Sequence, residues 1–150
     1  MNTRLGAGFA VRVAAFGLMT MMVTGAAMAQ VTTPPRGSPQ RSAILDGVRP
    51  MVQAEVGAPV EFVVHQMRVV GDWAFVLLSP QRPGGAPIDY RYTRYGEAVA
   101  GGFFDNQVSA LLRQSPSGWL VYEYDLGATD VPWVGWADYH PVPFDVLPGY

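Results

Sequence analysis

The spacing of apolar and polar positions divides the 150-residue chain into a helix, two pairs of strands and irregular connections. Between residues 39 and 56, aliphatic side chains recur at helical spacing and form one apolar face. That face consists of Ile44, Leu45, Val48, Val52 and Val56. Ser38 before Pro39 is typical of a helix start, and Gly57 is typical of a helix end. We therefore predict a helix over 39–56, with a kink or break in its middle because Pro50 lacks an N–H group.

Two runs rich in β-branched and aromatic residues follow, at 60–70 and 73–79. The Gly-Asp pair between them places glycine at the first central position of a turn, which suits a two-residue hairpin. Such a turn pairs Val70 with Trp73 across the two strands. These runs therefore predict an antiparallel hairpin.

Residues 105–114 and 119–125 lie on either side of a Ser-Pro-Ser-Gly turn, and we interpret them as a second hairpin. The stretch 106–113 also fits helical spacing, so strand and short helix both stay open there. Residues 88–95 fit an extended strand. Asp130 is placed to cap a short helical turn near the C-terminus.

This order of elements predicts the α+β class. One long N-terminal helix packs on a curved antiparallel sheet of about four to five strands, and a short helical turn follows near the C-terminus. Strands joined by turns this short cannot be parallel. Residues 39–150 then form a single domain, long enough to be held by one core.

The N-terminal residues follow a different pattern, that of a secretory signal peptide. Two arginines precede an uncharged run over 13–22, and Ala27 and Ala29 occupy the −3 and −1 positions that signal peptidase requires. We predict that residues 1–29 are removed, that the protein is periplasmic or secreted, and that no stable membrane insertion follows cleavage. The next segment, 30–38, is rich in Pro and Thr and is predicted to be a flexible tether.

Charge and cysteine content exclude several partners and cofactors. All ten basic residues are arginine and two leave with the signal peptide, so the exported chain has 8 basic against 12 acidic side chains, net −4. Such a chain lacks the basic surface that nucleic acids and anionic lipids require. Without cysteine there is no thiol nucleophile, no thiolate-bound metal and no cysteine-linked haem. Two histidines are too few for an all-protein zinc site, and we expect no cofactor and no metal.

Four short motifs span most of the exported chain. They are Arg49-Pro50 with Gly57-Ala58-Pro59-Val60-Glu61-Phe62, Gly71-Asp72-Trp73-Ala74-Phe75-Val76, Ala110-Leu111-Leu112-Arg113 with Gly118-Trp119, and Gly127-Ala128-Thr129-Asp130-Val131-Pro132-Trp133. With these motifs the stretch 41–148 resembles an uncharacterised family of small secreted bacterial proteins, a resemblance that implies no activity. The order of helix and strands is also similar, in topology alone, to the cystatin-like and NTF2-like α+β rolls, and a fold does not imply a function.

The first candidate binding surface is the segment 89–95, which is rich in arginine and tyrosine. Both residue types combine large contact area with directional hydrogen bonds and are enriched at binding hot spots. In an extended segment Tyr90 and Tyr92 share one face, and with Arg91 and Arg94 they form our first predicted site. The alternative is an edge strand whose tyrosine rings cover the core.

The second candidate surface is aromatic and lies near the C-terminus. Trp133 and Trp136 fit helical spacing, and with Tyr139 and Phe144 they form a cluster on which a sugar ring can stack. The alternative is that the two indole rings cover the end of the sheet core.

These patterns predict a small, secreted, non-enzymatic binding or accessory module whose partner is an envelope protein or, in second place, a glycan. Two alternatives stay open. One is a small NTF2-like enzyme with a pocket between helix and sheet, in which Glu61 and His65, on one face of a strand, carry acid–base chemistry. The other is a glycan-associated or envelope-associated structural protein.

Overall fold

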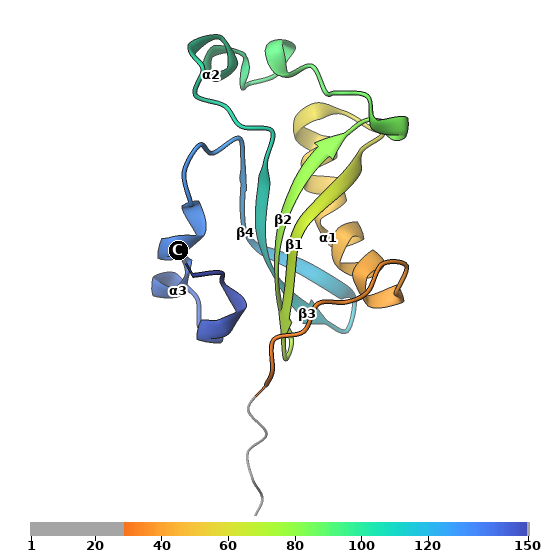
Figure 1. Ribbon diagram of the computed structural model, residues 1–150, viewed down its shortest axis with the longest axis vertical. Helices are drawn as coiled ribbons and strands as arrows, with labels where there is room; N and C mark the ends of the chain where they lie inside the picture. The colour runs from red at the N-terminus through yellow and green to blue at the C-terminus, as the bar shows by residue number, and fades with distance from the viewer. Residues whose placement is uncertain (1–28, 150) are drawn as a thin grey trace, which may run out of the picture.

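The computed structural model describes residues 29–149 and contains one sheet with a long helix on one of its faces (Figure 1). The four strands pair antiparallel in the order β1-β2-β3-β4. The bounds are α1 Pro39–Val56, β1 Glu61–Val70, β2 Trp73–Gln81, β3 Val108–Ser115 and β4 Gly118–Leu126. The predicted α+β fold, with a long N-terminal helix on an antiparallel sheet, is confirmed.

Helix α1 begins and ends at its capping residues. The Ser38 hydroxyl accepts a hydrogen bond from the Arg41 backbone N–H at 3.2 Å, and Gly57 ends the helix at a φ of 79°. The buried side chains are Ile44, Val48, Val52 and Val56. The break predicted at Pro50 does not occur: one helix runs from Pro39 to Val56. Its apolar face packs on the sheet on both sides of Pro50, and this burial outweighs the missing hydrogen bond.

Both predicted hairpins are present. Gly71 has a φ of 59°, and the register pairs Val70 with Trp73 as predicted. Strands β3 and β4 form the second hairpin. The stretch left open at 106–113 becomes a strand because β3 is paired on both sides, with β2 and with β4.

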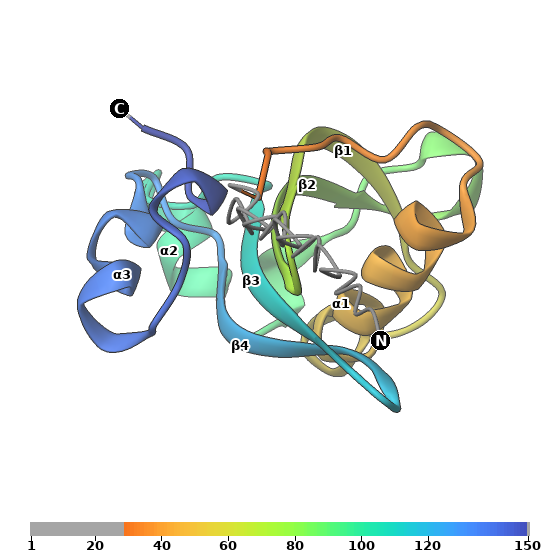
Figure 2. The same cartoon turned by 90° about the horizontal axis from the view of Figure 1, so that it is seen from below.

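The sheet separates two apolar layers (Figure 2). On one face α1 packs against side chains of all four strands. The other face is covered by residues 127–149, here called the C-terminal layer, which contain η3 Pro132–Gly135, α3 Trp136–Tyr139 and η4 Phe144–Val146. The buried residues that meet there are Val70, Trp73, Phe75, Leu111, Trp133, Trp136 and Val146. The predicted C-terminal helical turn is confirmed, but no side chain caps it, so the prediction for Asp130 is wrong.

Residues 82–107, here called the β2–β3 connection, lie beyond one end of the sheet (Figure 1). They carry η1 Pro83–Gly85, η2 Tyr90–Tyr92 and α2 Gly96–Gly101. The strand predicted at 88–95 is therefore wrong. The Asp89 carboxylate accepts from the Arg91 N–H at 3.1 Å, and the Thr93 hydroxyl donates to the Tyr90 carbonyl at 2.7 Å. Such local bonds between side chain and backbone favour a turn over a sheet ladder.

The segment predicted as a tether contacts the sheet. Thr32 forms an antiparallel bridge with Val69, with both backbone hydrogen bonds at 2.8 Å, and the Thr33 hydroxyl donates to the Met67 carbonyl at 3.1 Å. Residues 1–28, and with them most of the predicted signal peptide, lie outside the described residues. Within residues 29–149, no helix has the length and apolar character that crossing a bilayer requires.

Candidate functional site

The residues of the arginine–tyrosine segment 89–95 fall into two groups. Some hold the segment to the rest of the protein, and others are exposed to solvent. Tyr90 is buried, with 7% of its surface exposed, and its hydroxyl donates to the Asn106 side-chain oxygen at 2.5 Å. Its ring packs on Phe104 at a centroid distance of 4.4 Å and on Tyr95 at 6.4 Å. Burial raises the pKa of Tyr90 to about 12. Tyr90 therefore belongs mainly to the packing beneath the connection, and its remaining surface lines an open pocket of about 340 Å³ together with Arg91 and Asn106.

Arg94 fastens the β2–β3 connection to the helix. Its Nε lies 2.8 Å from Oε2 of Glu55 in α1, and its Nη2 donates to the Tyr95 hydroxyl at 2.9 Å. The hydrogen bond with Tyr95 raises the pKa of the Arg94 guanidinium. The guanidinium also lies 4.9 Å from the centre of the Tyr95 ring. Two of its three nitrogens are thus engaged within the chain, and the side chain is 66% exposed.

Arg91 and Tyr92, here called the exposed tip, project from η2. Tyr92 is 88% exposed. Arg91 makes a two-pronged contact with Asp89, with Nε to Oδ1 at 2.9 Å and Nη2 to Oδ2 at 2.6 Å. This hydrogen bonding lowers the pKa of Asp89 to about 2. Tyr90 and Tyr92 do not share a face, because the turn of η2 buries the first ring and exposes the second.

Trp133 and Trp136 lie in the core beneath the C-terminal layer, with 8% and 7% of their surfaces exposed. Both approach the Phe75 ring, Trp133 at a centroid distance of 5.2 Å and an interplanar angle of 62°, Trp136 at 6.3 Å and 56°. Tilted and edge-to-face packing of this kind is typical of buried aromatic clusters. Neither indole presents the open face that stacking on a sugar requires.

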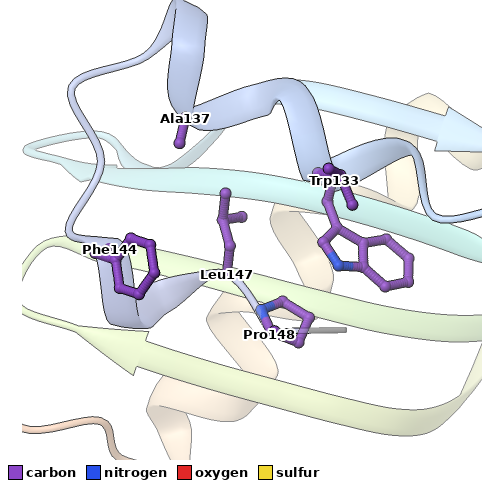
Figure 3. A pocket seen from close by; sticks show the side chains of 7 residues that line it. Trp133, Ala137, Phe144, Leu147 and Pro148 are labelled. Carbon is purple, nitrogen blue, oxygen red and sulfur yellow. The ribbon is translucent and has the colours of Figure 1, made fainter.

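One edge of Trp133 contributes to a groove between the helical turns and the chain's final residues (Figure 3). The groove, here called the C-terminal groove, has a volume of about 180 Å³. Its lining consists of Trp133, Val134, Ala137, Phe144, Leu147, Pro148 and Gly149. Figure 3 shows Trp133 and Ala137, from η3 and α3, on one side of the groove and Phe144, Leu147 and Pro148 on the other. Phe144, which is 90% exposed, forms part of its apolar wall.

The final residues are held against the sheet, so the groove has a fixed wall. Val146 is fully buried against the sheet. From β1, the Arg68 guanidinium donates to two backbone carbonyls, that of Asp145 at 2.6 Å through Nη2 and that of Val146 at 3.2 Å through Nε. Phe144 and Leu147 lie on either side of this anchor, and Leu147 also packs against the buried cluster beneath the C-terminal layer.

Both signs of charge lie near the groove: Arg68 from β1 contacts the backbone of Asp145 and Val146, and the chain that forms the groove carries carboxylates. From residue 114 to residue 149 the chain contains no arginine. It contains five carboxylates there, Glu123, Asp125, Asp130, Asp138 and Asp145. Asp138 and Asp145 are exposed and directly follow the lining residues Ala137 and Phe144. The groove is thus apolar inside, with carboxylates next to its lining residues in the chain.

Glu61 and His65 are both exposed on β1. His65 lies where the register shifts by one residue, and its Nε2 is 2.7 Å from the Ser79 hydroxyl. In nucleophilic catalysis a histidine can act as the base that activates a serine. Such a site also needs hydrogen-bond donors that stabilise the transition state and a pocket that excludes water. An exposed strand face supplies neither. Between residues 29 and 149, no group of three or more His, Asp or Glu side chains is placed to hold a metal ion.

Sequence reasoning named Phe144 only as one member of an aromatic cluster and missed the groove. Leu147 and Pro148 carried no signal beyond the recurrence of proline in this part of the chain. Comparison of the chain with models of protein families, with curated proteins and with solved structures gives no match.

Proposed function

We propose that the protein is a secreted, non-enzymatic binding module of the bacterial cell envelope and that its partner is another protein. The observation that carries the proposal is the C-terminal groove, an anchored apolar surface with the Phe144 ring almost fully exposed. Exposed apolar grooves rimmed by polar residues mark interaction sites in many proteins. The groove takes an apolar side chain of the partner as an anchor.

The lining favours a protein partner over a glycan. Sugars present hydroxyl groups, and each hydroxyl that loses water without gaining a hydrogen bond costs about 1–3 kcal/mol. The lining side chains include no carboxylate, amide or hydroxyl, and Trp133 is buried where a stacking platform would need an open ring. An aliphatic or aromatic side chain has no such requirement.

The charge of the region specifies the partner further. The carboxylates of Asp138 and Asp145 complement lysine or arginine beside the apolar anchor. The partner segment is therefore apolar at its centre and basic at its flanks. The exposed tip, with Tyr92 at 88% exposure, is the second surface that a larger partner would touch.

The enzyme alternative rests on the contact between His65 and Ser79. Both residues lie on a partly exposed region of the sheet. The space between α1 and the sheet, where the alternative places its pocket, is filled by fully buried side chains such as Val48 and Val52. We expect hydrolysis of an activated ester to be no faster for the intact protein than for His65→Ala. A clear loss of rate in His65→Ala would favour the enzyme.

The binding site is tested by crosslinking in the cell that makes the protein. The photoreactive residue p-benzoylphenylalanine replaces Phe144, Tyr92 or, as a control on the sheet, the 43% exposed Val63. We expect one protein to be captured from position 144 and none from position 63. In extracts, raising the salt concentration from about 0.05 M to about 0.5 M weakens the capture, as does Asp138→Asn with Asp145→Asn. Capture from position 92 alone would move the site to the exposed tip, and capture from neither position would contradict the proposal.

A further inference from the structure

The sequence contains no lysine. Lysine side chains and the N-terminal amine are the only primary amines of an unmodified protein. A chain without lysine therefore carries a single one, at its N-terminus. The chemistry of the first residue decides whether the folded protein has any primary amine at all.

We infer that the exported protein has none, because its first residue, Gln30, closes into a pyroglutamate ring. The inference rests on the proposed export and on cleavage after Ala29, the position that the small residues at 27 and 29 favour. An N-terminal glutamine contains both reacting groups, the α-amine as nucleophile and the Cδ carbon of the side-chain amide as electrophile. Bond formation between them closes a five-membered ring.

The reaction balances without an oxidant or a second substrate. The α-amine nitrogen of Gln30 attacks the Cδ carbon of its own side-chain amide, and a C–N bond forms. The bond from Cδ to the amide nitrogen breaks, and that nitrogen leaves as ammonia with a proton from the amine. The α-amine has an ordinary pKa of about 7.7–8.0, so part of it is neutral and nucleophilic at neutral pH.

The structure leaves room for the ring at this position. The first residue paired with the sheet is Thr32, whose N–H donates to the Val69 carbonyl at 2.8 Å and whose carbonyl accepts from the Val69 N–H at 2.8 Å. Gln30 and Val31, which precede it, are exposed. Ring closure uses the N-terminal nitrogen and the side chain of Gln30, neither of which takes part in that pairing.

The ring has consequences for charge and for the edge of the sheet. It removes the positive charge of the N-terminus from a chain whose side chains already carry a net charge of −4. It also removes the free amine that aminopeptidases require. The segment that pairs with the edge of β1, Thr32 and Thr33, is thereby protected from trimming.

The test is the N-terminal peptide of the exported protein. The full-length chain is exported by a bacterial cell with a C-terminal hexahistidine tag, purified and digested with trypsin, which cuts after Arg36. We expect the peptide 30–36 with a mass about 17 Da below that of the open form, the mass of the ammonia lost. An amine-reactive dye, added to the denatured protein, is expected to label no molecule.

A matched variant makes the dye measurement decisive. Gln30→Ala keeps the cleavage site and cannot form the ring, so we expect one dye per chain. A chain that begins at an open Gln30 and takes up one dye would overturn ring closure and leave export intact. A chain that retains residues 1–29 would overturn both, and a chain that begins at any other residue would overturn the inference. If the protein binds its partner but its first residue is not Gln30, the binding proposal stands and the inference of ring closure fails.

Discussion

The β2–β3 connection and the C-terminal layer are both irregular, and they combine apolar burial and polar contacts in different proportions; the connection buries Ile88 and Tyr90. Polar contacts fasten the connection to the helix: Arg94 contacts Glu55, and Arg82 donates to the carbonyls of Val56, Gly57 and Pro59 at 2.6–2.9 Å. Apolar burial holds the C-terminal layer to the sheet through Trp133, Trp136 and Val146. Exposed ion pairs contribute little free energy, whereas buried aromatic side chains contribute several kcal/mol. The stability of the two segments should therefore respond very differently to substitution.

The largest effect is expected in the C-terminal layer. Trp136→Ala removes a buried indole from its packing on Phe75 and should lower the free energy of unfolding by about 3–5 kcal/mol. The measurement is urea unfolding followed by circular dichroism. Phe144→Ala is the matched control, since its ring is 90% exposed and its loss should change stability by less than about 0.5 kcal/mol. Equal losses in the two variants would contradict the division into core and contact surface.

Alkaline pH should reveal the packing beneath the connection. Burial raises the pKa of Tyr90 to about 12, whereas an unfolded tyrosine loses its proton near pH 10. The stabilisation is complete below pH 10 and is lost as the pH rises from 10 to 12, because the unfolded chain then binds fewer protons than the folded one. One such tyrosine accounts for up to about 3 kcal/mol over this interval. Urea midpoints measured from pH 9 to pH 11.5 should fall, and a smaller fall is expected in Tyr90→Phe.

Two tyrosine hydroxyls in this region should have opposite effects when removed. The Tyr124 hydroxyl is buried and has no hydrogen-bond partner among residues 29–149, whereas the Tyr90 hydroxyl is bonded to Asn106. Removing an unpaired buried hydroxyl relieves a desolvation penalty, so Tyr124→Phe should raise the free energy of unfolding by about 1 kcal/mol. Tyr90→Phe should lower it by a similar amount, about 1 kcal/mol. Thermal unfolding at pH 7 decides the sign, and a loss of stability in Tyr124→Phe would show that the hydroxyl has a partner.

The smallest effect on stability is expected at the ion pair between Arg94 in the connection and Glu55 in α1. The Arg94 side chain is 66% exposed, so its ion pair with Glu55 is screened by water and salt. Arg94→Ala should cost less than about 1 kcal/mol, and the effect should shrink further in high salt. Hydrogen exchange of residues 88–101 is the more sensitive readout, because faster exchange there would show local opening without global unfolding. Unchanged exchange would mean that the apolar packing of Tyr90 holds the connection alone.

The candidate site could be predicted from the sequence only in part. The residue types of segment 89–95 pointed to a surface feature, and Arg91 and Tyr92 are indeed exposed. Its geometry could not be predicted, because Asp89 and Thr93 bond to nearby backbone groups and turn the chain where alternation suggested a strand. The C-terminal groove could not be predicted from the sequence for another reason. Its walls come from two segments that meet only because both pack on the same sheet face.

The sequence by itself determined the parts of this protein that depend on short-range geometry. Helix α1 follows from apolar spacing and from Ser38, and the two hairpins follow from short turns between strands that are neighbours in the chain. Only the tertiary structure decided which aromatic side chains are buried. A tyrosine or tryptophan has the same local preference in a core as on a surface, and burial depends on partners far along the chain: Asn106 for Tyr90 and Phe75 for Trp133.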